Sequence, residues 1–227
     1  MSSDRKRHFD ADYREEVELR DGTTAVMRLV RPDDKELFVQ GLERLSPESR
    51  YFRFFTSKDR LSAWELRYFT EVDQESHFAF GAMRTHDSGE IEPLAVARFV
   101  RFKDEPDVAE AAIVVVDDAQ GLGLGRTMFL RLIEAARERG VQTFRADVLM
   151  QNDGMRKLLG QLAPIRSENP DGPSVVVDLD LTQDDDKYED DAVYRVFRLV
   201  AEQLISIRRI IEGLVKRDEP SKPERDA

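Results

Sequence analysis

The spacing of apolar residues along the chain changes between two periods, about 3.6 residues for helices and about 2 for strands. Apolar positions three and four residues apart predict helices over residues 35–45, 61–70, 127–139 and 152–162, and Ser46-Pro47 begins a further helix. Alternating or β-branched runs predict strands over residues 17–19, 24–30, 77–84, 93–103, 113–116, 143–149 and 174–181. Residues 169–173, NPDGP, predict a turn before the last of these strands.

The order of these elements predicts the fold class. Asp21-Gly22 between two alternating runs is typical of a β-hairpin. The strands in the middle of the chain follow one another without a helix between them, which favours an antiparallel meander. The helix over residues 127–139 lies between two strands and predicts one parallel crossover. We therefore expect an α+β fold, in which a mixed central sheet is layered between flanking helices.

The chain is organised around residues 110–126, EAAIVVVDDAQGLGLGR, where a buried strand meets a helix through a glycine-rich turn. The first N–H groups of a helix lack intrahelical partners and carry partial positive charge, so such a turn can bind a phosphate group. A dinucleotide-binding GxGxxG would need glycine at position 126 or 128, and a Walker loop would need Gly-Lys-Ser/Thr. Neither is present. A purely structural role for the turn stays open at this point.

Composition narrows the possible functions. The net charge of −11 and the pI of about 4.9 argue against nucleic-acid binding, which needs a basic surface. An acidic surface attracts basic substrates such as lysine side chains or polyamines, although it can also serve solubility alone. The chain has no cysteine and its three histidines lack metal-ligand spacing, so we expect no metal. Without an apolar run of membrane-spanning length or a secretory signal, we expect a cytoplasmic protein with no membrane contact.

The termini differ from the centre in composition. We expect residues 1–15 to be a disordered extension, residues 16–182 to form the folded domain, and residues 183–191, rich in aspartate, to be a linker. Residues 192–216 predict an amphipathic helix and residues 217–227 a polar tail. Apolar residues at alternating spacings of four and three over residues 193–214 fit a short heptad seam, which predicts either a homodimer or a helix docked on its own domain.

The spacing Gln-x-x-Gly-x-Gly, formed by Gln120, Gly123 and Gly125, resembles the coenzyme A loop of the GNAT superfamily of N-acyltransferases. The order around it, a strand with a preceding glutamate, then helix, strand and an Asn-headed helix, resembles the same family over about residues 17–181. The segments at residues 31–34 (RPDD), 45–55 (LSPESRYFRFF) and 69–77 are similar to the GNAT domain of bacterial protein-lysine acetyltransferases, some of which act on acyl-CoA synthetases. The resemblance implies transfer of an acetyl group from acetyl-CoA to an amine, with protein lysine as the favoured acceptor.

The resemblance also assigns roles to residues. Glu110 would be the general base that deprotonates the amine, and the alternative is a surface glutamate at the edge of the sheet. Gln120 would brace the turn, and Asn152 would bind the pantetheine arm or simply cap its helix. Backbone groups would hold the acyl carbonyl and pantetheine at Val115, Val116 and Asp117, and the pyrophosphate at Gly121, Leu122, Gly123, Leu124, Gly125 and Arg126.

One feature departs from the family pattern. Many relatives carry a tyrosine shortly after the asparagine to protonate the leaving thiolate, whereas here no tyrosine follows Asn152 before Tyr188. Either solvent would then supply that proton, or the activity would be weak. His77 is an alternative base, although a structural histidine is the favoured reading. Two other functions stay open: acetylation of a small amine or polyamine, and a non-catalytic CoA-binding regulatory module.

Overall fold

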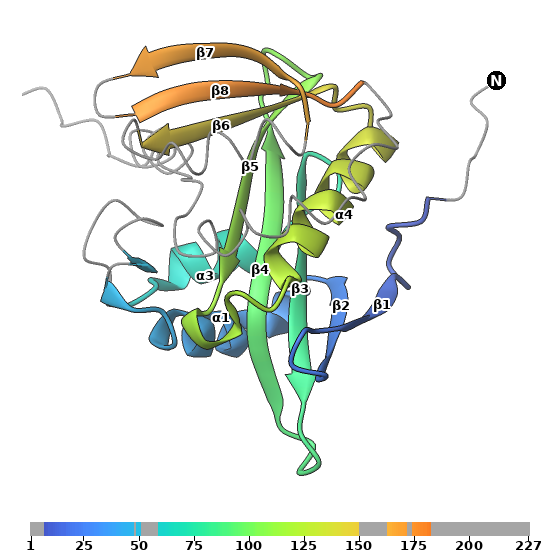
Figure 1. Ribbon diagram of the computed structural model, residues 1–227, viewed down its shortest axis with the longest axis vertical. Coiled ribbons are helices and arrows are strands. Elements are labelled where there is room, and N and C mark those ends of the chain that lie inside the picture. The colour runs from blue at the N-terminus through green and yellow to red at the C-terminus, as the bar shows by residue number, and fades with distance from the viewer. Residues whose placement is uncertain (1–6, 48, 51–58, 150–162, 172–173, 183–227) are drawn as a thin grey trace, which may run out of the picture.

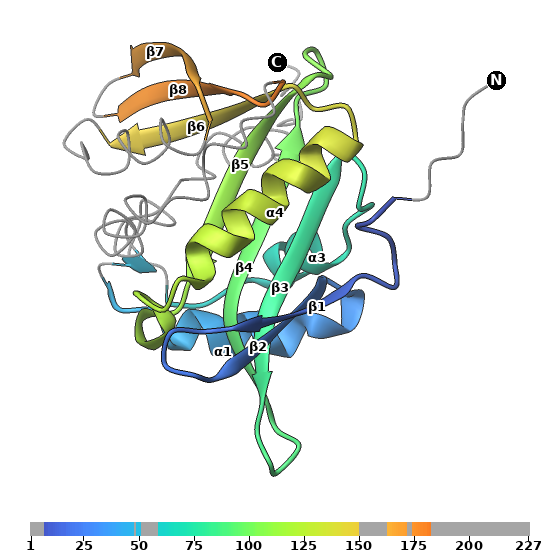
Figure 2. The same ribbon diagram turned by 45° about the vertical axis from the view of Figure 1, so that its right-hand side comes forward.

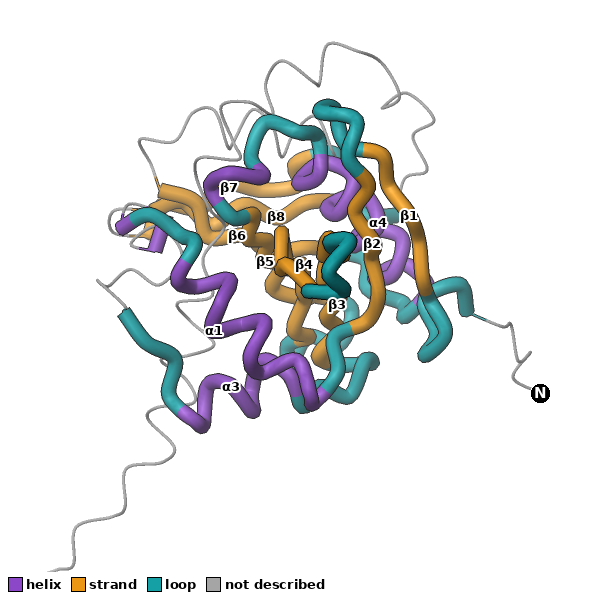
Figure 3. Tube along the Cα trace, turned by 90° about the horizontal axis from the view of Figure 1, so that it is seen from below, coloured by secondary structure: helices purple, strands orange, loops and turns teal. Residues whose placement is uncertain are grey.

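A computed structural model describes residues 7–47, 49–50, 59–149, 163–171 and 174–182 of the chain. Within this part, eight strands form one mixed sheet in the order β1-β2-β3-β4-β5-β6-β8-β7 (Figure 1). Helices α1 (Lys35–Glu43) and α3 (Ala63–Thr70) lie on one face of the sheet, and α4 (Leu124–Glu138) lies on the other (Figures 2 and 3). The predicted α+β layering of a mixed sheet between helices is confirmed.

The first five strands pair antiparallel in chain order, which confirms the predicted hairpin of the first two and the predicted meander in the middle of the chain. Asp21 and Gly22 make the first hairpin turn, in which Gly22 has a φ of 80° that favours glycine. The strands are β1 (Arg14–Glu18), β2 (Thr24–Leu29), β3 (His77–Thr85), β4 (Ile91–Arg101) and β5 (Val108–Val115).

The second half of the sheet follows the crossover through α4. Strand β6 (Thr143–Leu149) runs parallel to β5, which confirms the single parallel connection. Strands β8 (Ser174–Asp180) and β7 (Ile165–Asp171) continue the sheet with antiparallel pairing.

Strand β7 differs from the sequence prediction, which has no strand at residues 165–171 and places a turn at residues 169–173. Residues 169–171 belong to β7 instead. The strand lies at the end of the sheet order, so one of its edges has no neighbouring strand in the described part of the chain. An edge strand tolerates proline and does not need an alternating apolar pattern, which explains why IRSENPD does not resemble a strand.

Local signals account for the helix starts. Ser62 caps α3, because its Oγ accepts a hydrogen bond from the N–H of Glu65 at 3.2 Å. The carboxylate of Glu65 in turn accepts from the N–H of Ser62 at 2.8 Å, which completes a capping box. Helix α4 begins at Leu124, three residues earlier than the predicted start at Thr127.

The main core lies between the sheet and α4. Its largest members are aromatic or long aliphatic side chains that are almost fully buried, and they include Phe78, Phe80, Phe99, Phe144, Met128 and Leu132. A smaller cluster of Leu42, Leu45 and Val114 packs on the opposite face, beneath α1. The side chains of β5 therefore point alternately into two apolar layers, as expected for a central strand that is covered on both sides.

The N-terminal segment corrects the prediction of disorder up to residue 15. Phe9 and Tyr13 are only 1% and 5% exposed, and β1 already begins at Arg14. The guanidinium of Arg139 donates to the carbonyl of Phe9 at 2.8 Å and lies over the ring of Phe78. Two aromatic side chains thus anchor a segment whose other residues are mainly polar, and this tertiary contact overrides the composition.

Three predicted C-terminal segments, the linker at 183–191, the helix at 192–216 and the tail at 217–227, lie outside the described residues. The homodimer through residues 193–214 accordingly stays a prediction. Of the helices that the structure describes, none has the length and apolarity needed to cross a membrane.

Candidate active site

The site is built where β5 and β6 separate. Their parallel pairing covers residues 108–110 of β5 and 143–145 of β6, and its last pair is Glu110 with Arg145. Beyond that pair β5 stays bonded to β4 as far as Val115, while β6 stays bonded to β8 as far as Leu149. The two strands therefore diverge, as Figure 1 shows, and in the described residues no ladder joins their outer halves.

Glu110 lies at the base of this opening. Ala109, Ala111 and Val115 on the same strand face the core beneath α4, so alternation places the side chain of Glu110 on the face of α1 and α3. It is only 5% exposed. The alternative of a surface glutamate is therefore wrong, and a buried carboxylate stands at the point where the strands part.

The backbone of β5 presents its groups alternately to β4 and to the opening. The N–H of Val116 donates to the carbonyl of Leu94 on β4 at 2.9 Å. This corrects the expectation that the Val116 N–H serves the acyl or pantetheine group. Because successive N–H groups point to opposite sides of a strand, that of Val115 faces the opening. Asp117 begins the short 3-10 helix η2 (Asp117–Ala119), whose first N–H groups lack partners within the helix.

The glycine-rich turn leads directly into α4. Gly121 and Gly123 have φ values of 75° and 88°, a left-handed conformation that favours glycine. Gly123 is the N-cap of α4 and has no side chain to satisfy the first N–H groups, which belong to Leu124, Gly125 and Arg126. The absent Cβ atoms and the uncapped helix start are the features that a pyrophosphate site needs.

Gln120 braces this turn, as its predicted role requires. Its Nε2 donates to the carbonyl of Val115 at 3.2 Å and to Oδ1 of Asp117 at 3.1 Å. The side chain of Asp117 has a second function that the sequence prediction missed. It accepts a hydrogen bond from the N–H of Ser46 and another, at 2.5 Å, from Oγ of Ser49. The turn is thereby tied to the start of the helix that follows α1.

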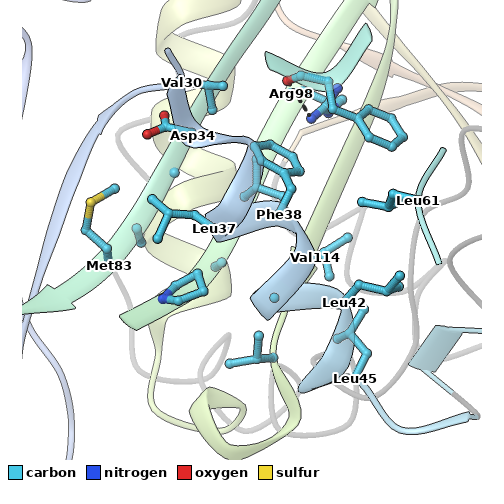
Figure 4. A pocket seen from close by; sticks show the side chains of 18 residues that line it. Val30, Asp34, Leu37, Phe38, Leu42, Leu45, Leu61, Met83, Arg98 and Val114 are labelled. Carbon is cyan, nitrogen blue, oxygen red and sulfur yellow. Dashed lines mark hydrogen bonds between the residues drawn. The ribbon is translucent and has the colours of Figure 1, made fainter. Parts of the chain in front are cut away.

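An apolar pocket lies between α1 and strands β3 to β5 (Figure 4). Leu37, Phe38 and Leu42 line it from α1, and the fully buried Arg98 reaches it from β4. The guanidinium of Arg98 lies over the ring of Phe69, 4.5 Å from its centroid. Nothing in the sequence pattern distinguishes this arginine from a surface one, and its burial was not predicted.

The position of His77 disfavours it as the base. Its Nε2 lies 3.2 Å from Nη1 of Arg98. Burial, together with the positive charge of Arg98, lowers the pKa of His77 to about 3. An imidazole with so low a pKa is a weak proton acceptor, so a structural role for His77 is favoured.

Two further expectations concern ligands. Asn152 lies outside the described residues, so its role stays a prediction. In the ranges that the structure describes, His, Asp and Glu residues form no group of three suited to a metal ion.

Comparison with known proteins relates this geometry to a family. The model of the acetyltransferase (GNAT) family matches residues 40–162, which is more than half of the chain. An acetyltransferase of Pseudomonas aeruginosa is 31% identical over 159 residues, covering 70% of this chain and 84% of that protein. The acetyltransferase Pat of Mycolicibacterium smegmatis is 37% identical over 150 residues, which cover 66% of this chain and 44% of that protein.

Solved structures agree with the sequence matches. The GNAT domain of S. lividans PAT superposes with a TM-score of 0.65 at 32% identity, covering 76% of this chain and 99% of that domain. A cAMP-binding acyltransferase from Mycobacterium smegmatis gives a TM-score of 0.51 at 29% identity, covering 83% of this chain and 53% of that structure. The chain thus spans about half the length of the two mycobacterial proteins. The family match, the bacterial relatives and the shared fold together show that this chain belongs to the acetyltransferase (GNAT) family.

Proposed function

We propose that this protein transfers an acetyl group from acetyl-CoA to the side-chain amine of a protein lysine, with Glu110 as general base. One observation carries the proposal: a carboxylate that is 5% exposed lies at the last β5–β6 pair, where the strands part. The choice of lysine rests on the similarity of residues 31–34, 45–55 and 69–77 to the GNAT domains of protein-lysine acetyltransferases.

The donor side of the proposal uses groups around the glycine-rich turn. The first N–H groups of α4, behind Gly121 and Gly123, would bind the pyrophosphate of acetyl-CoA. The backbone at Val115 and Asp117 would bind the acyl and pantetheine groups, and Asn152 would add a hydrogen bond to the pantetheine arm. Gln120 supports the binding of the donor by holding the turn against Val115.

The chemistry on the acceptor side follows from the protonation of lysine. An amine with a pKa near 10.4 is almost entirely protonated at neutral pH, so it must lose a proton before it can attack. Glu110 would accept that proton directly or through a water molecule. The nitrogen lone pair then forms a bond to the thioester carbonyl carbon, and the N–H of Val115 would stabilise the resulting oxyanion.

Collapse of this intermediate breaks the carbon–sulfur bond and releases the coenzyme A thiolate. A thiol with a pKa near 8.5 is a fair leaving group, so solvent can supply the proton to the sulfur without a tyrosine. The amide nitrogen loses its second proton to water, and Glu110 returns the proton that it accepted to solvent. The products are an N-acetylated lysine and free coenzyme A, which accounts for all atoms and charges.

The test is an incubation of the full chain with acetyl-CoA and three acceptor sets: purified acyl-CoA synthetases, lysine peptides, and free polyamines such as spermidine. We expect mass spectrometry to find acetylated lysine in protein, together with release of coenzyme A thiol. Acetylated polyamine with unmodified protein would instead establish the small-amine function. Binding of acetyl-CoA in calorimetry without thiol release for any acceptor would establish a non-catalytic module.

A further inference from the structure

A second buried carboxylate, that of Asp147, flanks the opening between β5 and β6. It lies on β6, where the side chains of residues 143, 145 and 147 point to one face. Arg145 pairs with Glu110 across the parallel ladder, and paired residues share a face of the sheet. Asp147 therefore lies on the same face as Glu110, two residues beyond the last pair. This is the face of α1 and α3.

The carboxylate of Asp147 is not satisfied within the described structure. The residue is 8% exposed, and its Oδ1 is buried without accepting a hydrogen bond. A buried carboxylate oxygen without a donor carries a large desolvation cost, so native proteins pair such groups with a donor, a cation or a ligand. The position calls for a positively charged or hydrogen-bonding group that the described residues do not supply.

The neighbouring cation is already engaged. Nε of Arg145 lies 2.9 Å from Asp178, and Nη1 lies 2.8 Å from Glu105. These two carboxylates raise the pKa of the Arg145 guanidinium above its usual value, with Asp178 as the larger cause. Arg166, which donates to Oγ1 of Thr143 at 2.8 Å, is likewise engaged by Asp180 at 2.7 Å. In the described structure the five carboxylates of Glu105, Asp178, Asp180, Glu110 and Asp147 thus outnumber the two arginines of β6 and β7, Arg145 and Arg166. The opening is therefore electronegative, which favours a cationic ligand.

The distance between the Glu110 and Asp147 positions suits the binding of one ammonium group. Asp147 lies roughly 7 Å further along the strand than the Glu110–Arg145 pair, and β6 is about 5 Å or more from β5. Side chains from both strands can reach a narrow aliphatic chain that enters between them. A lysine side chain combines such a chain with a single positive charge at its end.

Building on the proposed function, we infer that Asp147 binds the ammonium group of the acceptor amine before Glu110 accepts its proton. The two carboxylates then have different tasks on either side of the opening. Asp147 selects a cationic amine and holds its nitrogen, whereas Glu110 removes the proton. The positive charge of the bound amine offsets the cost of burying the Asp147 carboxylate. Binding of the amine thus explains why Oδ1 of this carboxylate lacks a partner in the described structure.

The test uses Asp147→Asn, which keeps the shape of the side chain and removes its charge. The probe is N-acetyl-lysine methylamide at saturating acetyl-CoA. We expect KM for the probe to rise at least tenfold, kcat to change less than threefold, and the Kd for acetyl-CoA to stay the same. Glu105→Gln is the matched control, because it removes one negative charge beside Arg145 at an exposed side chain. Its KM should change less than twofold.

Two readouts separate this role from a merely structural one. Removing an unpartnered buried charge should leave the Tm equal or higher, whereas loss of a structural contact would lower it. Asp147→Glu, which keeps the charge, should recover part of the lost kcat/KM. Equal KM values for wild type and Asp147→Asn would overturn the inference while leaving the proposed function intact.

If the wild-type protein transfers no acetyl group, the proposed function is wrong, but the inference about Asp147 can still be tested by binding alone. Calorimetry then compares N-acetyl-lysine methylamide with its neutral norleucine counterpart in the presence of coenzyme A. Wild type should bind the lysine probe more tightly, and Asp147→Asn should bind both probes equally. An absence of preference in the wild type would overturn the inference.

Discussion

Glu110 on β5 and Arg145 on β6 form the last pair of the parallel ladder between these strands. On one side of this pair the sheet is continuous, and on the other side β5 and β6 keep only their outer neighbours in the described structure. A strand pair that separates in this way exposes backbone N–H groups to a ligand without unfolding either strand. The position of Glu110 at the branching point is the basis of the first prediction.

Replacing Glu110 with glutamine should lower kcat at least about 100-fold, because a positioned general base contributes about two to four orders of magnitude. The amide keeps the size of the side chain but accepts no proton, so the Kd for acetyl-CoA should not change. Stopped assays of coenzyme A release over a range of pH values measure the effect. The control is Glu90→Gln in the exposed β3–β4 turn. Unchanged turnover with the same pH dependence would rule out Glu110 as the base.

Replacing Asp117 with alanine should weaken acetyl-CoA binding and lower the free energy of unfolding by about 2 kcal/mol or more, since hydrogen bonds to a charged group are lost. The carboxylate accepts from Ser46, Ser49 and Gln120, so the glycine-rich turn loses its attachment to a distant helix start. Calorimetry and urea unfolding provide the two measurements. Asp118→Ala is the control, because that carboxylate is largely exposed. A Kd equal to that of wild type would show that the attachment does not shape the turn.

Replacing Gly123 with alanine should cost about 1–2 kcal/mol of stability, because its φ of 88° lies in the left-handed region that side chains disfavour. The same change should raise the Kd for acetyl-CoA, since Gly123 forms the N-cap of α4. Gly41→Ala is the matched control within α1. Its Cβ would meet only Pro93 at 4.0 Å, and alanine favours a helix, so stability should rise or stay the same. Equal effects of the two substitutions would contradict the assigned strain.

Stability should depend on pH through His77. Its pKa falls from the usual 6.5 to about 3 in the folded state, so between these values the unfolded chain binds a proton that the folded chain does not. The contribution of His77 to the free energy of unfolding therefore rises with pH between about 3 and 6.5, by up to about 1.4 kcal/mol per pH unit. Above pH 6.5 this contribution is constant. Urea unfolding between pH 4.5 and 7.5 should show a smaller slope for His77→Gln. The exposed His86→Gln should keep the wild-type slope, and two equal slopes would disprove the assignment.

Replacing Phe9 with alanine should lower the free energy of unfolding by about 3 kcal/mol, the usual cost of removing a buried aromatic ring. The ring is 1% exposed and makes an edge contact with Phe78. Thermal and urea unfolding measure the change, with the exposed Asp12→Ala as control. If residues 7–15 were disordered, both substitutions would leave stability unchanged.

The elements that the sequence predicts well depend on neighbours within a few residues. The capping box of Ser62 and Glu65 closes over three positions, and the hairpin at Gly22 depends on one φ angle. These features depend on interactions between residues close in the chain, so the pattern of residues is enough to predict them. Strand β7 has no such signal, because its pairing with β8 compensates for a sequence that does not favour a strand by itself.

Contacts between distant residues could not be predicted in the same way. The hydrogen bond from Ser49 to Asp117 joins residues 68 positions apart, and the carbonyl of Phe9 meets Arg139 across 130 positions. Ser49, Asp117 and Arg139 look like ordinary polar surface residues in the sequence. The burial of Arg98 belongs to the same class, since it depends on helices α1 and α3 covering β4.

By itself, the sequence determined the glycine-rich turn, the class of the fold and the candidate base, because glycine spacing and apolar period are properties of short segments. The tertiary structure alone decided which backbone groups of β5 face the opening and that Val116 does not. It also placed Asp147 on the same face of the sheet as Glu110, although the two lie on different strands. The physical reason is that strand register and divergence depend on pairing between β5 and β6, which the 15-residue helix α4 separates in the chain.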